Sequence, residues 1–405
     1  MKPPVLFLEQ QAWRAGGQRV LEDVLDALVE DFEPLVAFPE DGPFAAALRS
    51  RNIETLFYPL GSYRPGRKSW GEMVGFVGCS VACGLQLARV IARRGIRLIY
   101  INGPRCLPAG VLAARLTRTP SVFHLHRALT RKSDLLIAAR AAAHVTKIVA
   151  VSEAAAASLV GANPNLASVM QVLYNPLRRP PSAHSSVAAD SRLPAQLSPG
   201  GGPTVGMVGR ITPQKGQMIL LRAAAQLRDR WPNLEIVFVG APEEKSREDA
   251  AYLDGLKSAA AELGLESNVT WAGYQSDPGP YYASLDLLAL PSIESEGLPM
   301  VALEAMTWRV PAVASYWPGT AEIIRDGANG LLVAPGDERA LAGALERVLR
   351  DDTLRAHLKL GAGASLDERF SPEVFRRQIH ALVSNLIGSS RDTRHTTEKE
   401  VEARA

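Results

Sequence analysis

Two glutamates that lie eight positions apart, Glu296 and Glu304, are the residues whose type and spacing first suggest chemistry. Gly297, Leu298 and Pro299 follow the first of them and predict a turn that opens a helix, with Pro299 at the first helical position, where its missing N–H costs nothing. The free N–H groups of a first helical turn attract phosphate, and carboxylates accept strong hydrogen bonds from sugar hydroxyls. The segment therefore predicts a sugar-nucleotide site, with a surface loop carrying two unrelated glutamates as the alternative.

A second group of residues follows the apolar segment 204–208. Gly209 allows a sharp turn and the close approach of another group. Arg210 offers a planar guanidinium fork, and Lys215 offers a mobile ammonium. The two cations are suited to clamping a diphosphate leaving group, although they also fit the description of two solvated basic residues. The spacing is not that of a P-loop.

The elements that must position these residues alternate along the chain between short apolar runs and longer helical stretches. This alternation predicts parallel sheets with crossover helices, an α/β fold. The expected strands are 5–8, 35–38, 54–58, 98–101, 121–125, 147–151 and 169–173 in the first half, and 204–208, 235–240, 268–272, 285–290, 311–315 and 330–333 in the second. We expect two tandem doubly wound units facing across a cleft, because ligands of open parallel sheets bind beyond the carboxyl ends of the strands.

The domain boundaries follow from changes in composition. We expect an acceptor-side domain at residues 1–178, a linker rich in Pro, Ser and Gly at 179–203, and a donor-binding domain at 204–370. A capped helix at 371–388 is expected to pack back on the first domain. The polar residues 389–405 are expected to be disordered.

Charge is unevenly distributed although the formal net charge is only +3. Residues 1–180 contain 22 Lys and Arg against 13 Asp and Glu, whereas residues 200–388 contain 18 against 24. A basic first half suits a phosphate-bearing acceptor or an anionic membrane surface, and ordinary drift between two domains is the alternative. No nucleic-acid recognition motif is present.

The remaining composition points to a cytoplasmic protein. Cys79, Cys83 and Cys106 show no metal-ligand spacing and are expected to be reduced. We find no apolar run of the roughly 20 residues that a membrane helix needs.

The motif Gly-Arg-x4-Lys-Gly at 209–216, followed by Glu-Gly-Leu-Pro-x4-Glu-Ala-Met at 296–306, resembles the donor domain of a family-4 retaining glycosyltransferase with the two-Rossmann, B-type fold. Further segments resemble that family in order, at 16–18, 149–153, 174–176, 319–322 and 326–330. The resemblance spans nearly the whole chain.

The resemblance implies roles for the residues of the donor site. Arg210 and Lys215 would neutralise the diphosphate as the glycosidic bond breaks. Glu304 would bind the ribose, and Glu296 would contact the transferred sugar. The other implied donor-binding positions lie against the diphosphate, the sugar or the base: Gly17, Gly209, Gly273, Tyr274, Gly297, Leu298, Met300 and Val301.

His126, at the end of the segment 121–126, matches the position of the family's active-site histidine, which supports the sugar by hydrogen bonding. We therefore assign a catalytic set of His126, Glu296, Arg210 and Lys215. The family uses a UDP-, GDP- or ADP-sugar without a divalent metal or other cofactor, and it retains the anomeric configuration.

We expect the acceptor to be a glycan or a lipid-linked hydroxyl, in cell-surface polysaccharide, lipopolysaccharide or glycolipid synthesis. Its candidate contacts are basic or polar residues of the first domain: Arg64, Arg67, Lys68, Asn102 and Arg127. A basic loop with neighbouring aromatic side chains is also suited to peripheral association with the inner membrane surface. A solvated loop is the alternative. The competing functions are a sugar-nucleotide epimerase of the same fold and a catalytically silent scaffold.

Overall fold

The computed structural model describes residues 2–13, 16–60, 70–177, 201–244, 246–366 and 368–402. The chain divides into two compact units. Unit 1 contains Met1–Pro176 and Arg369–Ala405, and unit 2 contains Leu177–Glu368. The structure contains strands and helices near the positions expected in each half of the chain. The α/β class, with two parallel sheets, is confirmed.

Unit 1 is built on a parallel seven-stranded sheet in the order β3-β2-β1-β4-β5-β6-β7. Its strands are β1 (Pro4–Glu9), β2 (Glu33–Phe38), β3 (Glu54–Phe57), β4 (Leu98–Asn102), β5 (Ser121–Leu125), β6 (Lys147–Ala150) and β7 (Met170–Val172). The central strands are mostly apolar because both faces of the sheet are covered by helices, and their polar residues include Glu9 and Asn102 at the carboxyl ends of β1 and β4.

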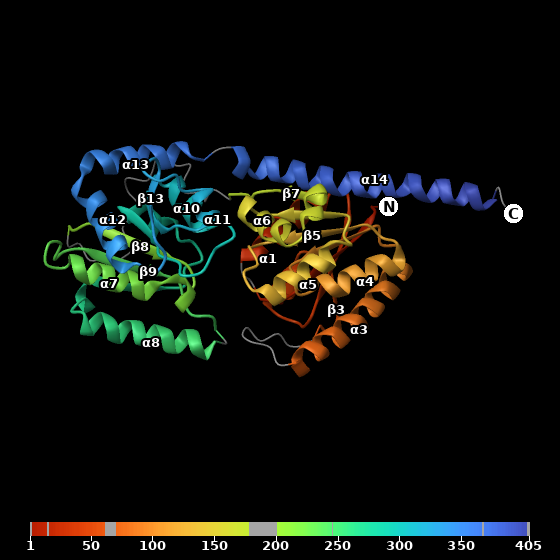
Figure 1. Ribbon diagram of the computed structural model, residues 1–405, viewed down its shortest axis with the longest axis horizontal. Helices are drawn as coiled ribbons and strands as arrows, with labels where there is room; N and C mark the ends of the chain where they lie inside the picture. Colours follow the sequence, from red (N-terminus) through yellow and green to blue (C-terminus); the bar gives the residue numbers. More distant parts are fainter. Residues whose placement is uncertain are drawn as a thin grey trace. The chain divides into compact units, whose positions relative to one another are not determined.

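Helices cover the two faces of this sheet in separate layers (Figure 1). One layer contains α3 (Trp70–Arg94), α4 (Leu107–Thr117), α5 (Lys132–Ala142) and α6 (Glu153–Ala162), each packed on the next. The other contains α1 (Gly16–Leu28), α2 (Pro43–Ser50) and α14 (Pro372–Glu402), which share one hydrophobic core with β1 and β2. A short 3-10 helix, η1 (Pro164–Val169), precedes β7.

The long helix α3 corrects the expectation that the chain lacks a stretch able to cross a membrane. Its segment Gly71–Arg94 is long and apolar enough to do so by length and composition, with a mean hydropathy of 1.7 over an 18-residue window. Interspersed Gly, Ser and Gln residues break up the apolar run while leaving the average hydropathy high. Only 28% of that window is buried in the fold.

The C-terminal helix α14 continues beyond the end that we predicted. Residues 389–405 were expected to be disordered, but the helical backbone extends to Glu402. No Gly or Pro lies between Ser389 and Glu402 to interrupt the helical hydrogen bonds. Its first half packs on α1, and Phe375, Ile379 and Val383 are buried in the core of unit 1.

Unit 2 is built on a parallel six-stranded sheet in the order β10-β9-β8-β11-β12-β13. Its strands are β8 (Thr204–Val208), β9 (Glu235–Val239), β10 (Val269–Gly273), β11 (Leu287–Leu290), β12 (Ala312–Ser315) and β13 (Gly330–Val333). Its helices are α7 (Gln217–Leu227), α8 (Arg247–Glu262), α9 (Gly279–Ser284), α10 (Met300–Thr307), α11 (Pro318–Ala321), α12 (Glu338–Arg350) and α13 (Asp352–Ala364), and the 3-10 turns are η4 (Pro213–Lys215), η5 (Glu266–Asn268) and η6 (Glu368–Phe370), the last lying at the boundary with unit 1.

The start of α10 differs by one residue from the prediction. Pro299 is the residue before the helix, with φ −75° and ψ 87°, and the first helical residue is Met300. A ψ of 87° lies outside the helical range, so the chain turns into the helix only after the proline.

The packing of α14 leads to a prediction about unit 1. Phe375→Ala removes a side chain that is 1% exposed, and we expect the free energy of unfolding to fall by about 3–5 kcal/mol. Chemical unfolding measures this loss. Gln378→Ala, at an exposed position of the same helix, is the matched control and should change stability little. Equal effects for the two variants would show that α14 does not belong to the core.

Candidate functional site

Polar residues lie at the carboxyl ends of the strands at one point in each sheet. At this point, the switch point, the strands on either side follow the chain in opposite directions across the sheet. In unit 1 the switch point lies between β1 and β4, and in unit 2 it lies between β8 and β11. The helices that follow neighbouring strands at such a point leave on opposite faces of the sheet, so a crevice opens for a ligand. Both groups of predicted site residues follow these strands.

At the switch point of unit 1, a carboxylate is buried at the last residue of β1. Glu9 is fully buried. Its Oε1 accepts hydrogen bonds from Gln18 Nε2 at 2.8 Å and from the backbone N–H groups of Gln10 and Gln11 at 2.7 and 3.1 Å. Its Oε2 accepts from Asn102 Nδ2 at 2.5 Å. Burial nevertheless dominates and raises the pKa of Glu9 from 4.5 to about 7.

Asn102 connects this carboxyl group to His126. Asn102 Oδ1 lies 2.7 Å from His126 Nε2. Because an amide oxygen can only accept, His126 carries its hydrogen on Nε2, and Nδ1 is left with a lone pair. The Nδ1 atom is buried and has no hydrogen-bond partner among the described residues. Glu9, Asn102 and His126 therefore form a chain, which we call the Glu9 network, that orients one free acceptor.

The imidazole of His126 is held neutral by its surroundings. Burial lowers the pKa of His126 from 6.5 to about 4. The ring of His124 lies behind it, with ring centroids 4.2 Å apart, and Tyr100 Oη lies 2.7 Å from His124 Nδ1. Burial, with a smaller contribution from His126, also holds the pKa of His124 well below its usual range. At neutral pH His126 is therefore a hydrogen-bonding group and not a cation.

Gly17 lies beside this histidine in the first turn of α1. A methyl group at Gly17 would lie 3.4 Å from His126 Cδ2, in ordinary contact. The helix start and the imidazole thus face each other, and both belong to unit 1. Arg127, the next residue, is exposed.

In unit 2 the structure brings two of the predicted donor-site residues into direct contact. Lys215 Nζ lies 2.8 Å from Glu296 Oε2, and their side chains are only 28% and 18% exposed. The hydroxyl of Ser292 donates to the other carboxylate oxygen of Glu296. The indole N–H of Trp317 in turn donates to the backbone carbonyl of Ser292 at 2.9 Å. Lys215 and Ser292 therefore hold the carboxylate directly, and Trp317 supports the backbone of Ser292.

Close backbone contacts fix the loops that carry this ion pair. Gly216 has φ +79°, and a Cβ atom there would lie 2.1 Å from the carbonyl oxygen of Pro291. At Gly319 a Cβ atom would lie 2.4 and 2.5 Å from the carbonyl oxygens of Gly297 and Glu296. Neither distance is possible for a side chain, so these two positions require glycine.

The helix α10 carries free backbone N–H groups at its start and a glutamate one turn later. No described residue accepts the backbone N–H groups of Leu298, Met300 and Val301, while Ala302 N donates to Pro299 O at 2.9 Å. Glu304, one turn into the helix, is partly buried and accepts from Tyr282 Oη at 2.8 Å through Oε2. Free amides and a partly buried carboxylate thus lie on one short helix.

Arg210 does not join the Lys215–Glu296 pair. Its Nη1 lies 2.6 Å from Glu243 Oε2, and both side chains are about half exposed, at 49% and 53%. An exposed pair of this kind contributes little to stability and is easily exchanged for another anion. The neighbouring loop at Gly273 carries Tyr274, whose side chain is 69% exposed.

The acceptor candidates are placed only in part. Arg64, Arg67 and Lys68 lie outside the described residues. Asn102 is 1% exposed and belongs to the Glu9 network. Within the described ranges, no three His, Cys, Asp or Glu side chains are grouped as metal ligands.

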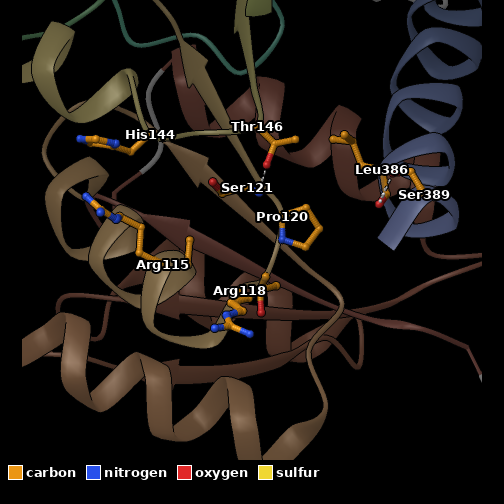
Figure 2. Close-up of a pocket in the computed structure, with 10 residues that line it drawn as sticks. Arg115, Arg118, Pro120, Ser121, His144, Thr146, Leu386 and Ser389 are labelled. Carbon is orange, nitrogen blue, oxygen red and sulfur yellow. Dashed lines mark hydrogen bonds between the residues drawn. The ribbon is translucent and has the colours of Figure 1, made fainter. Parts of the chain in front are cut away.

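A separate pocket of about 430 Å³ lies in unit 1 at the amino ends of the strands, opposite to their carboxyl ends. It is lined by Arg115, Arg118, His144 and Thr146, among others, at the amino ends of β5 and β6 (Figure 2). Because His126 follows the carboxyl end of β5, this pocket is not part of the site described above.

Sequence reasoning missed several residues that hold the site together: Glu9, Ser292, Trp317 and Tyr282. Glu9 carried a usable signal, because it is a charged residue that directly ends an apolar strand and precedes the glycines at 16–17. The other three have no local signal. They contact the site from segments whose position depends on the tertiary fold.

Two family models match the chain in succession. Residues 14–177 match the model described as Glycosyltransferase Family 4, and residues 191–362 match Glycosyl transferases group 1. The first covers most of the N-terminal part of unit 1, and the second covers most of unit 2.

Curated relatives match over part of their length. LpsE of Rhizobium meliloti (strain 1021), a lipopolysaccharide core biosynthesis glycosyltransferase, is 32% identical over 176 residues, which are 44% of this chain and 48% of that protein. The D-inositol 3-phosphate glycosyltransferase of Salinispora arenicola (strain CNS-205) is 33% identical over 230 residues, 54% of this chain and 50% of that protein. The chain spans about half the length of the curated relatives it matches.

Solved structures match over nearly the whole chain. HepE of Anabaena in complex with UDP has a TM-score of 0.76 and 26% identity, over 95% of this chain and 100% of that one. Its complex with UDP-glucose has a TM-score of 0.75 and 25% identity, over 94% and 99%. WaaG, at 18% identity and a TM-score of 0.66 over 93% and 99%, shares the fold. Taken with the two family models, these matches show that the chain belongs to glycosyltransferase family 4 and has the two-Rossmann, B-type fold expected from its sequence.

Proposed function

We propose that this protein transfers a hexose from a UDP-sugar to a hydroxyl of a glycan or lipid-linked acceptor, with retention of the anomeric configuration. The observation that carries the proposal is the Lys215–Glu296 pair, whose glutamate lies four residues before the first residue of α10, Met300. A cation, a carboxylate and the unpaired N–H groups at the start of a helix are the groups suited to binding a phosphate and a sugar. The complexes of HepE with UDP and UDP-glucose support the choice of donor.

The ion pair would change partners when the donor binds. The Lys215 ammonium would turn from Glu296 to the diphosphate, which carries more negative charge. Glu296 would then accept hydrogen bonds from hydroxyls of the transferred sugar. Arg210 would likewise leave its exposed partner Glu243 for the diphosphate, at little cost. In the absence of donor these carboxylates stand in for the anion.

The remaining donor contacts divide between the base and the ribose. Glu304, held by Tyr282, would accept from the ribose hydroxyls. The loop of Gly273 and Tyr274 would lie against the base, and the exposed phenol ring of Tyr274 is free to stack on it.

In the reaction, the bond between the anomeric carbon and the diphosphate oxygen would break, and UDP would leave with the electron pair. The acceptor oxygen would bond to the anomeric carbon on the same face, and its proton would pass to an oxygen of the leaving diphosphate. Arg210 and Lys215 would stabilise the charge that develops there. In unit 1, His126 would act as a neutral hydrogen-bonding group held in place by the Glu9 network.

For the acceptor we propose a component of a cell-surface glycan, assembled at the cytoplasmic face of a membrane. The role of LpsE in lipopolysaccharide core synthesis supports this class. The basic character of residues 1–180 supports a phosphate-bearing acceptor.

A donor screen tests the proposal directly. UDP-glucose and other UDP-sugars should raise the melting temperature of the protein and release UDP during turnover, whereas GDP- and ADP-sugars should do neither. NMR of the product should show the anomeric configuration of the donor. No shift with any nucleotide sugar would favour the silent scaffold, and an inverted product would refute the proposed reaction.

The two glutamates should separate in their effects. We expect Glu304→Gln to weaken donor binding by about tenfold, because a ribose hydroxyl loses a charged acceptor. Glu296→Gln should lower kcat by about 100-fold with a smaller change in donor affinity, since its contact lies at the transferred sugar. Donor titration and steady-state kinetics measure both constants. Glu338→Gln, in the first turn of α12 with a side chain that is 38% exposed, is the control. Indistinguishable effects of the two glutamates would disprove the division of roles.

The Glu9 network predicts a dependence of stability on pH. The folded pKa of Glu9 is about 7, above its ordinary value of 4.5, so the folded protein holds a proton that the unfolded chain has released. Stability from this group falls as pH rises from about 4.5 to 7. His126, with its folded pKa lowered from 6.5 to about 4, has the opposite effect over an overlapping window.

Substitution separates the two groups. Glu9→Gln removes the contribution of Glu9 and keeps those of the other groups, His126 and His124 among them. The free energy of unfolding of this variant, relative to the natural protein, should therefore increase between about pH 4.5 and 7 and then level off. Urea unfolding at a series of pH values measures this difference, and any constant cost of the amide cancels from the slope. A difference independent of pH would mean that Glu9 is not held protonated.

A further inference from the structure

A row of apolar side chains on α3 faces solvent. Val74, Val77, Val81 and Leu85 are 59%, 60%, 46% and 45% exposed. Their spacing of three, four and four residues places them on one side of the helix. We call these four residues the α3 face. Contiguous exposed apolar groups of this kind mark an interaction surface on a folded protein.

The opposite side of α3 is firmly anchored in unit 1. Cys83, Leu87 and Ile91 are buried, and Cys83 Sγ donates to the carbonyl oxygen of Pro59 at 2.9 Å. At Gly84 the helix lies so close to α4 that a Cβ atom would meet the side chain of Leu112 at 2.8 Å. The helix is a structural layer of the fold, which argues against its crossing a bilayer even though its hydropathy would permit that.

Basic residues accompany the α3 face, and acidic residues are scarce. Arg89 and Arg93, one and two turns after Leu85, are exposed and have no ion-pair partner in the described part of the chain. Glu72 is the one acidic residue in the sequence of α3. Residues 51–150 contain 16 Lys and Arg against three Asp and Glu. Two exposed arginines therefore follow the apolar row on the same helix, within a stretch of sequence that is strongly basic.

We propose that the α3 face docks on the surface of an anionic phospholipid bilayer. An amphipathic helix that lies in the interface buries its apolar side among the acyl chains while nearby cations contact anionic headgroups. Valine and leucine on the outer side of α3, with Arg89 at the edge of the row, match that arrangement. The inference does not rest on the transfer reaction, because none of the donor-site residues lies on α3.

A second copy of the chain suits this face less well. Two copies that met through it would bring two cationic regions together, whereas anionic headgroups neutralise them. The α3 face is also aliphatic, and cores of protein interfaces are enriched in aromatic residues.

Flotation with lipid vesicles tests the proposal. The full chain should float with vesicles of phosphatidylcholine and phosphatidylglycerol, and less with phosphatidylcholine alone. The double variant Val77→Glu, Val81→Glu should lose at least about tenfold in partitioning, because it sets two carboxylates against the anionic surface. Both valines are about half exposed or more, so folding should be unaffected. Leu360→Glu, at a position 69% exposed in unit 2, is the matched control and should float normally.

The outcomes separate this proposal from its alternatives. Flotation of the double variant at the natural level, or no flotation of the natural protein, would overturn it. A natural protein that is dimeric by light scattering, with a monomeric double variant, would assign the face to a second copy instead. Arg89→Glu should weaken flotation at low salt more than at high salt. The thermal shift with UDP-glucose should be the same in the double variant, so failure here is distinct from failure of the donor proposal.

Discussion

The polar side chains of the two sites lie at the carboxyl ends of the parallel strands. Helices cover both faces of each sheet, so most strand residues are apolar and polar groups are placed where the strands end. In unit 1 the carboxyl edge of the sheet receives Glu9, Asn102 and His126 from three neighbouring strands or their ends. In unit 2 it receives the loops of Lys215 and Glu296. Each group consists of side chains that could not be buried elsewhere without losing their partners. The order of the strands, more than any single residue, therefore creates the site.

Close backbone contacts in unit 2 hold the loops of Lys215 and Glu296 in place. The ion pair of Lys215 and Glu296 rests on loops that touch through main-chain atoms at Gly216 and Gly319. Such contacts leave no room for side-chain adjustment, so the carboxylate is fixed while the ammonium, on its long stem, can change partners. A rigid acceptor group beside a movable cation is suited to binding an anion that later departs.

The fold was accessible from the sequence because its signals were local. Alternating apolar runs predicted both sheets, and the motif at 209–216 with that at 296–306 marked the two loops. The Glu9 network was not accessible, since Asn102 and His126 lie far from Glu9 in the chain and meet it only once the order β1-β4-β5 is known. The length of α14 was misjudged because polarity alone does not end a helix. The apolar character of α3 was overlooked because it is spread between small polar residues.

The return of the last helix to the first unit affects the order in which the protein forms during synthesis. The core of unit 1 lacks Phe375 and Ile379 until almost the whole chain has left the ribosome, whereas unit 2 is complete at Glu368. Domains that emerge early usually fold early, but here the unit that begins first must finish last. Until then, the apolar sides of α1 and the sheet that α14 will cover remain open. The nascent protein therefore keeps the apolar surface under α14 exposed until that helix is made, and this surface is what a chaperone would have to protect.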